Sequence, residues 1–185
     1  MHAALQTVDL RHGTDVDRTA AAQAAAEGVL GHEVAVAGLV RSAIGSAAVQ
    51  RAVSLPHWRE MYVAVPLEGI TLEGYVDLVY RDAERGGLVV VDYKTDAVDE
   101  TTRAERVVKY NVQLAAYALA LAEATGEPVV AGVLCFLDPA GSVEIALEGP
   151  ALAAAVARVG ELAAAERADP SPLPAALPVP MGREA

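Results

Sequence analysis

Three charged residues lie in or directly after apolar stretches, and their types suit metal-dependent hydrolysis. Asp77 lies within Gly74-Tyr-Val-Asp-Leu-Val-Tyr80, and the apolar run 88–91 leads directly into Asp92 and Lys94. A buried charge is costly unless it is paired or bound to metal, so these positions require a partner. Side chains alternate along a strand, which places Asp92 and Lys94 on one face. On antiparallel neighbouring strands, Asp77 and Asp92 could hold one divalent cation with Lys94 beside it.

These three residues would form the set that phosphodiester hydrolysis needs. Carboxylates hold Mg²⁺, and a lysine orients or activates water and stabilises the developing charge. The alternation rule also places Tyr75, Asp77 and Val79 on one face of their strand. Purely structural roles stay open, since Asp92 and Lys94 could form only a salt bridge and Asp77 could be an edge charge.

A helix face downstream could reach over these carboxylates. Tyr110, Gln113 and Tyr117 follow at i, i+3 and i+7, so they line one side of a helix. As the alternative, the two tyrosines are ordinary half-buried residues and Gln113 faces solvent.

Composition indicates one folded domain without sites built from several cysteines. The 185 residues are 54% hydrophobic, enough for a substantial core. The single Cys135 excludes a disulfide within the chain and any four-cysteine zinc or iron–sulfur site.

No apolar run approaches the roughly 18 residues of a membrane span, so we expect no membrane association and a cytoplasmic protein. The net charge of −11 predicts weak affinity for DNA phosphates, because lysines and arginines supply that affinity.

Hydrophobic periodicity predicts a helical N-terminal part followed by a mixed core. Helices are expected over residues 1–10, 19–30, 33–46 and 150–167, with a short turn at 49–56. Strands are expected over residues 58–66, 70–80, 88–95, 129–137 and 142–147. Thr101 or Thr102 would cap a long helix that ends near Thr125, and the strand after it could return parallel to the third strand.

We therefore expect a single domain over residues 1–168. It would comprise N-terminal helices (1–56), a catalytic core (57–148) and a C-terminal helix (149–168). The proline-rich residues 169–185 are expected to form a flexible tail.

Four motifs, in order and spacing, resemble those of RecB-type nuclease domains of the PD-(D/E)xK superfamily. These domains typically lie at the C-terminus of UvrD/AddA-like helicases. The motifs are His2-Ala-Ala-Leu-Gln6, Gly74-Tyr-Val-Asp-Leu-Val-Tyr80, Val90-Val-Asp-Tyr-Lys-Thr95 and Tyr110-Asn-Val-Gln-Leu-Ala-Ala-Tyr117. The resemblance runs from His2 to about Ala165 and includes Phe136-Leu-Asp-Pro139.

The resemblance implies an α/β restriction-endonuclease-like core, with a mixed β-sheet flanked by helices, and assigns roles to residues that match the motifs. The implied metal ligands are His2, Asp77, Asp92 and the backbone carbonyl of Tyr93. The implied catalytic residues are Asp77, Asp92, Lys94, Gln113 and Tyr117, with Lys94 as the catalytic lysine and the last two supporting the site and the DNA strand. Glu60 matches an acidic position, for which an outer-shell or second-metal role and a structural role are both open.

The implied function is a DNA nuclease that depends on Mg²⁺ or Mn²⁺. It would release 5′-phosphate ends from single-stranded DNA supplied by a helicase partner, during recombination or repair. The chain has no Gly-x-x-x-x-Gly-Lys-Ser/Thr loop, so it has no ATP-driven motor of its own. The four-cysteine cluster of some relatives is absent too, which points to the subgroup without an iron–sulfur cluster.

The chain departs from the family pattern ahead of His2, where a glycine and small apolar residues are usual. A helix that lacks its first turn is expected to fray, which would weaken metal binding by His2. The alternative function is therefore a truncated, catalytically impaired domain that serves as a structural or DNA-docking module. A third interpretation is a generic α/β protein in which Asp92 and Lys94 only pair.

Overall fold

A five-stranded mixed sheet forms the centre of the protein. The computed structural model describes residues 1–95 and 103–168. The strands are β1 (His57–Leu67), β2 (Ile70–Asp82), β3 (Gly87–Lys94), β4 (Val129–Asp138) and β5 (Gly141–Glu148), and they lie in this order across the sheet. The pairs β1–β2, β2–β3 and β4–β5 are antiparallel, whereas β3 and β4 are parallel. The predicted crossover return of the fourth strand is therefore confirmed.

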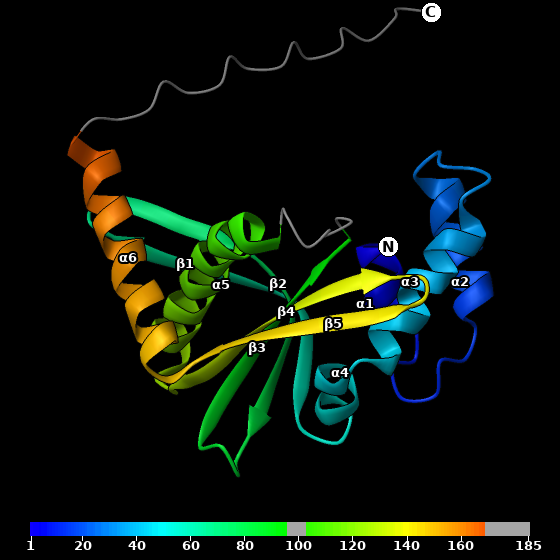
Figure 1. Cartoon of the computed structure of the whole chain (residues 1–185), viewed down its shortest axis with the longest axis horizontal. Coiled ribbons are helices and arrows are strands. Elements are labelled where there is room, and N and C mark those ends of the chain that lie inside the picture. Colours follow the sequence, from blue (N-terminus) through cyan, green and yellow to red (C-terminus); the bar gives the residue numbers. More distant parts are fainter. Residues whose placement is uncertain (96–102, 169–185) are drawn as a thin grey trace, which may run out of the picture.

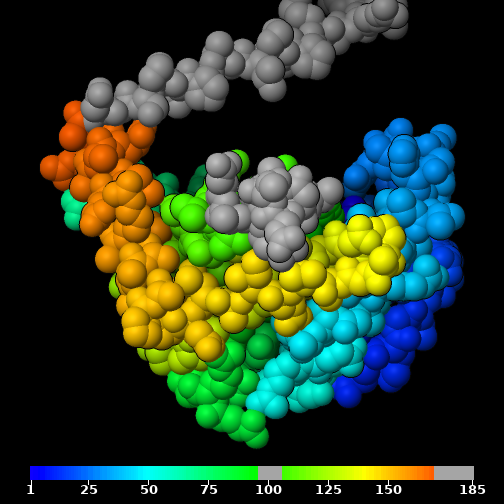
Figure 2. All heavy atoms as spheres, in the orientation of Figure 1, coloured from blue at the N-terminus to red at the C-terminus, as the bar shows by residue number. Residues whose placement is uncertain are grey.

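Helices cover both faces of this sheet, as α/β architecture requires (Figure 1). They are α1 (His2–Thr7), α2 (Val16–Ala26), α3 (Glu33–Gly45), α4 (Ala47–Ala52), α5 (Arg103–Thr125) and α6 (Gly149–Ala168). Figure 1 shows α5 and α6 at one side of the molecule and the N-terminal helices at the other. In the space-filling view, β5 runs across the visible face between them (Figure 2). The expected α/β core with a mixed, helix-flanked sheet is confirmed.

Two apolar clusters hold the layers together, and the sheet separates them. The first joins α1–α4 to Leu78, Val89 and Val91, and the second joins α5 and α6 to Val76 and Val90. The central strand β3 contributes alternately to both clusters, and residues 88–91 are at most 2% exposed. Its continuous apolar sequence therefore reflects burial on both faces, as expected for a strand with a parallel neighbour.

Helix boundaries differ from the predicted ones mainly in the N-terminal part. α2 covers Val16–Ala26 instead of residues 19–30, because Gly28 and Gly31 adopt left-handed backbone conformations (φ +70° and +89°) that end the helix early. α4 is a full helix rather than a turn, and the Ser46 hydroxyl caps it by accepting the Val49 N–H at 3.3 Å.

Two expectations fall outside the described residues. The predicted caps Thr101 and Thr102 lie in the stretch 96–102, and the expected flexible tail is residues 169–185. Among the helices of the described residues, none has the length and apolar character that a membrane span requires.

Candidate active site

The ladder between β1 and β2 is interrupted where two acidic residues face each other. Glu60 and Asp77 occupy the same register position, yet they do not pair, while the positions on either side do. Glu60 has φ +50°, a left-handed conformation that is unusual for a residue with a side chain. Strained backbone of this kind persists where the surroundings enforce it, often at functional sites.

The interruption changes the face of the sheet towards which the following side chains of β2 point. Residues two apart in a regular strand face the same side, but Val76 packs with α5 and Leu78 packs with the N-terminal helices. The prediction that Tyr75, Asp77 and Val79 share one face is therefore wrong. Val79 belongs to the α5 cluster with Val76, and Tyr75 is exposed. Asp77, at the interruption, turns its carboxylate towards the ends of α1 and β3.

Three potential metal ligands converge at this point. One ligand atom each from His2, Glu60 and Asp77 lies within 4.8 Å of the other two. The Nδ1 atom of His2 is 2.9 Å from Oδ1 of Asp77, and the His2 side chain is 45% exposed. The hydrogen bond to Asp77 and the charge of that carboxylate raise the pKa of His2, against the opposing effect of burial. A histidine and two carboxylates form a donor set that suits a divalent cation.

The helix that carries His2 packs against the N-terminal cluster and is anchored at its C-terminal end, while its first turn has no side-chain cap. Ala4 and Leu5 are at most 3% exposed, within the cluster beneath the N-terminal helices. The Arg59 side chain donates hydrogen bonds to the carbonyls of Leu5 (2.9 Å) and Val8 (2.8 Å), which no longer have partners within α1. The neighbour of Glu60 on β1 thus anchors α1 and keeps His2 at the site.

The second carboxylate of the predicted site is deeply buried. Asp92 is 4% exposed, and its Oδ2 lies 2.6 Å from Nζ of Lys94, with no well-aligned hydrogen bond at that oxygen. Burial raises the pKa of the Asp92 carboxyl, and the Lys94 ammonium opposes that shift. Asp77 approaches from β2 and accepts the backbone N–H of Tyr93 with Oδ2 at 2.7 Å. The Lys94 ammonium is thus the close partner of this oxygen, and a cation held by Asp92 would share the carboxylate with Lys94.

Lys94 is held by a chain of side chains from α5. Its Nζ donates to Oε1 of Gln113 at 2.9 Å, and Nε2 of Gln113 donates to the hydroxyl of Tyr117 at 2.9 Å. The same Nζ lies 4.4 Å from the ring centre of Tyr110. Tyr110, Gln113 and Tyr117 thus line one side of α5, and the first two contact Lys94, while the predicted reach of this face over the carboxylates stays a prediction.

Gly74 makes room for this arrangement. A Cβ atom at Gly74 would lie 2.8 Å from Cε1 of Tyr117, closer than two carbon atoms can approach. A glycine within a strand often marks such a close approach, so this signal was available in the sequence. The anchoring role of Arg59 carried no comparable signal, since one arginine in a strand fits many environments.

The structure brings the predicted residues together in two adjacent groups. His2 and Asp77 converge with Glu60, whereas Asp92 pairs with Lys94 and, through it, with α5. The ligand set His2, Asp77, Asp92 and the Tyr93 carbonyl therefore remains a prediction, and Glu60 lies closer to its centre than the sequence indicated.

Known proteins with similar sequences identify the family of this chain. The family model of the PD-(D/E)XK nuclease superfamily matches residues 1–176. An ATP-dependent helicase/nuclease subunit of Thermoanaerobacter sp. (strain X514) is 39% identical over 75 residues, which cover 38% of this chain and 6% of that protein. The subunit of the same name from Listeria monocytogenes serovar 1/2a is 34% identical over 86 residues, covering 43% of this chain and 7% of that protein.

The matched stretch is thus a small part of each of these relatives. Among solved structures, one titled "Crystal structure of SSO0001" superposes with a TM-score of 0.44 and 15% identity, over 83% of this chain and 71% of that one. The family match spans the strands, the helix α5 and the histidine helix that form the site, and the chain belongs to the PD-(D/E)XK nuclease superfamily.

Proposed function

We propose that this protein is a metal-dependent nuclease that hydrolyses phosphodiester bonds in DNA. One observation carries the proposal: the buried pair of Asp92 and Lys94 lies beside the convergent group of His2, Glu60 and Asp77. Carboxylates and an imidazole next to a positioned lysine fit phosphodiester hydrolysis better than they fit a structural ion pair, because a structural pair would not need the second group.

Each side chain of the site has a separate proposed role. Asp77 and Asp92, with His2, would hold Mg²⁺ or Mn²⁺, and Glu60 would bind the same ion directly or through water. The bound cation would supply charge that favours attack on a phosphodiester and departure of the leaving oxygen. Lys94, fixed by Gln113, would hold the attacking water in line and stabilise charge on the phosphate, which leaves a 5′-phosphate end.

Single-stranded DNA delivered by a helicase is the proposed substrate. The net charge of −11 gives this chain little affinity of its own for phosphates. The two relatives are named as helicase/nuclease subunits, and the matched residues make up 6% and 7% of them. A helicase domain or subunit would therefore supply the strand, in recombination or repair.

Cleavage of labelled single-stranded DNA by the purified chain with Mn²⁺ tests the proposal. Asp92→Ala and Lys94→Ala should abolish cleavage, and EDTA should do the same. Lys109→Ala is a matched control, because Lys109 is an exposed lysine on α5. Activity that survives both site substitutions would rule out this mechanism.

A second candidate function is a DNA-docking or structural module without catalysis, in which a partner would supply the DNA affinity that a net charge of −11 denies this chain. Binding of Mn²⁺ and DNA without any cleavage, by the chain alone and with a helicase partner, would favour this alternative.

A further inference from the structure

Two tyrosines form an exposed aromatic pair on the β1–β2 hairpin. Tyr62 and Tyr75 are directly opposite each other in the register, with ring centres 5.3 Å apart and planes inclined at 55°. They are 52% and 61% exposed. The Tyr62 hydroxyl donates to Oε2 of Glu73 at 2.7 Å, which limits the ring to one orientation. The hairpin thus presents two ordered, exposed ring faces to solvent.

This exposure is unusual for the protein. Its eight aromatic residues are one Trp, six Tyr and one Phe, and three of them are exposed. The third, Trp58, has the Arg81 guanidinium over its ring at 5.5 Å. A cross-strand aromatic pair also stabilises a hairpin, but this contribution does not require both rings to remain exposed.

The pair lies beside the candidate active site. Tyr62 and Tyr75 are each two residues from Glu60 and Asp77, or about 7 Å along the strands. This distance equals about two nucleotide steps of a stacked strand, at about 3.4 Å each. The neighbours Val63 and Gly74 face α5, so the tyrosine rings lie on the opposite face of the hairpin, the side of the sheet on which α1 packs. A strand that reaches His2 and Asp77 from this side could place a base on these rings.

The charge of the hairpin limits how a nucleic acid could bind here. Residues 60–76 contain Glu60, Glu68 and Glu73 and no lysine or arginine. The hairpin supplies no cation for the phosphates, so affinity here would have to come from the faces of unpaired bases, which stack on aromatic rings with little dependence on sequence. A duplex hides those faces, so this surface suits single strands.

We propose that Tyr62 and Tyr75 form a stacking platform for the bases of single-stranded DNA next to the scissile phosphate. The inference rests on the proposed nuclease function and assigns its strand preference to the hairpin. Each tyrosine contributes stacking, and the carboxylate of Glu73 fixes the orientation of the Tyr62 ring.

Equilibrium binding of fluorescein-labelled oligothymidylate tests the platform, measured by anisotropy with the full-length Lys94→Ala protein so that the DNA stays intact. Adding Tyr75→Ala or Tyr62→Ala should weaken binding about tenfold each. Tyr75→Phe should restore binding, because the ring remains. The dependence of affinity on salt should not change, since no phosphate contact is lost.

An oligonucleotide with abasic residues provides the matching control on the DNA side. It should bind more weakly than oligothymidylate, and Tyr75→Ala should weaken it no further. Val143→Ala, an equally exposed apolar residue on β5 (50%), should leave affinity for both DNAs unchanged. Thermal melting of each variant excludes unfolding as the cause.

Two results would overturn the platform: unchanged affinity of both tyrosine variants, or equal losses on abasic and normal DNA. The second would indicate a structural or protein-binding role for the pair. Hydrolysis of bis(p-nitrophenyl) phosphate by the wild-type chain, and its loss in Asp92→Ala, reports on the catalytic site separately. Hydrolysis without any tyrosine effect on DNA would remove the platform and leave the nuclease function intact.

Discussion

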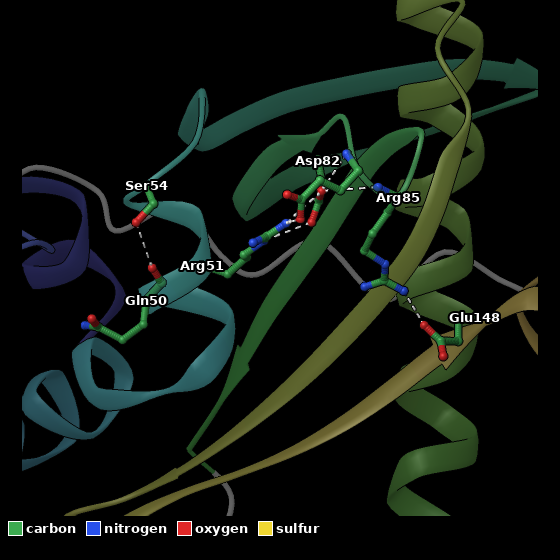
Figure 3. A network of polar contacts seen from close by, with 7 residues as sticks. Gln50, Arg51, Ser54, Asp82, Arg85 and Glu148 are labelled. Atoms are coloured by element: carbon green, nitrogen blue, oxygen red, sulfur yellow. Dashed lines mark hydrogen bonds and ion pairs between the residues drawn. The ribbon is translucent and has the colours of Figure 1, made fainter.

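Buried aspartates at the two ends of the β2–β3 ladder have opposite surroundings. At one end, Asp82 is 1% exposed, and Arg51 donates to its two oxygens at 3.1 Å each. The backbone N–H groups of Glu84 (3.1 Å) and Arg85 (3.3 Å) also donate to Oδ1 (Figure 3). At the other end, Asp92 has Lys94 as its close cation and one oxygen without an aligned donor.

The electrostatic consequences have opposite signs. The Arg51 guanidinium holds the pKa of the Asp82 carboxyl below its usual value, whereas burial raises the pKa of the Asp92 carboxyl. Figure 3 shows the network at Asp82 continuing through the Arg85 side chain to Glu148 on β5. The donors around Asp82 hold the hairpin end together, whereas Asp92 has the Lys94 ammonium as its close partner. A buried acid with a raised pKa and few aligned donors is a candidate functional group.

The largest expected effect is a loss of nuclease activity on substitution at the Asp92 end of the β2–β3 ladder. Asp92→Ala and Lys94→Ala should each lower kcat/KM for DNA by about a hundredfold to a thousandfold, because each removes a group that stabilises the transition state. Their melting temperatures should stay close to that of the wild type. A large loss of stability in Lys94→Ala would instead support the interpretation in which the two residues only pair.

Arg51→Ala should produce the reverse pattern. Removing the guanidinium leaves the buried Asp82 carboxylate with two backbone donors, so the melting temperature should fall by about 5 °C or more. Activity per folded molecule should be retained. Arg41→Ala is the control, since Arg41 and Asp17 form a pair in which both side chains are more than half exposed (53% and 80%), and its effect on melting should be small. Equal effects of the two substitutions would contradict the structural role of Asp82.

Gly74→Ala should impair the site without touching a charged group. The added methyl group would displace Tyr117, and the displacement would pass through Gln113 to Lys94. We expect kcat to fall about tenfold to a hundredfold, because small misplacements of catalytic groups are costly. Gly86→Ala is the control for strain, since Gly86 has φ +80° but no neighbour within 4 Å of its Cβ position, and it should affect stability alone. Unchanged kcat in Gly74→Ala would show that the Tyr117 position does not matter.

The smallest effect concerns acid stability. Because the pKa of Asp82 is lowered in the folded protein, its contribution to stability is present above the unfolded pKa near 3.8 and is lost as pH falls through the lower folded value. Wild-type protein should therefore lose more stability than Arg51→Ala between about pH 5 and pH 3. Denaturant unfolding at each pH measures the difference, and parallel curves for the two proteins would argue against it.

Periodicity predicted the parts of the site that depend on local geometry. Strand alternation placed Asp92 and Lys94 on one face, and helical spacing placed Gln113 and Tyr117 on one side of a helix, because both patterns follow from backbone repeat alone. The interruption at Asp77 was not predictable in this way. It depends on a left-handed Glu60, and no propensity favours that conformation at a glutamate.

The family resemblance placed His2 at the site with Asp77, but the contacts that anchor α1 could not be predicted for a related reason. Sequence reasoning treated α1 as an isolated helix end, for which fraying is the normal expectation. Two hydrogen bonds from Arg59, a residue more than fifty positions away, and the burial of Leu5 anchor the helix at its other end. Long-range contacts of this kind leave no local signal in the chain.

Binding of Mn²⁺, followed by the rise in melting temperature with metal concentration, tests the central claim most directly. The wild type and Arg51→Ala should both gain stability as Mn²⁺ increases, because a ligand that binds only the folded state stabilises it. Asp77→Asn should lose this response, because Asp77 contacts His2 and Tyr93 and converges with Glu60. An equal response in Asp77→Asn and the wild type would contradict a metal site at His2, Glu60 and Asp77.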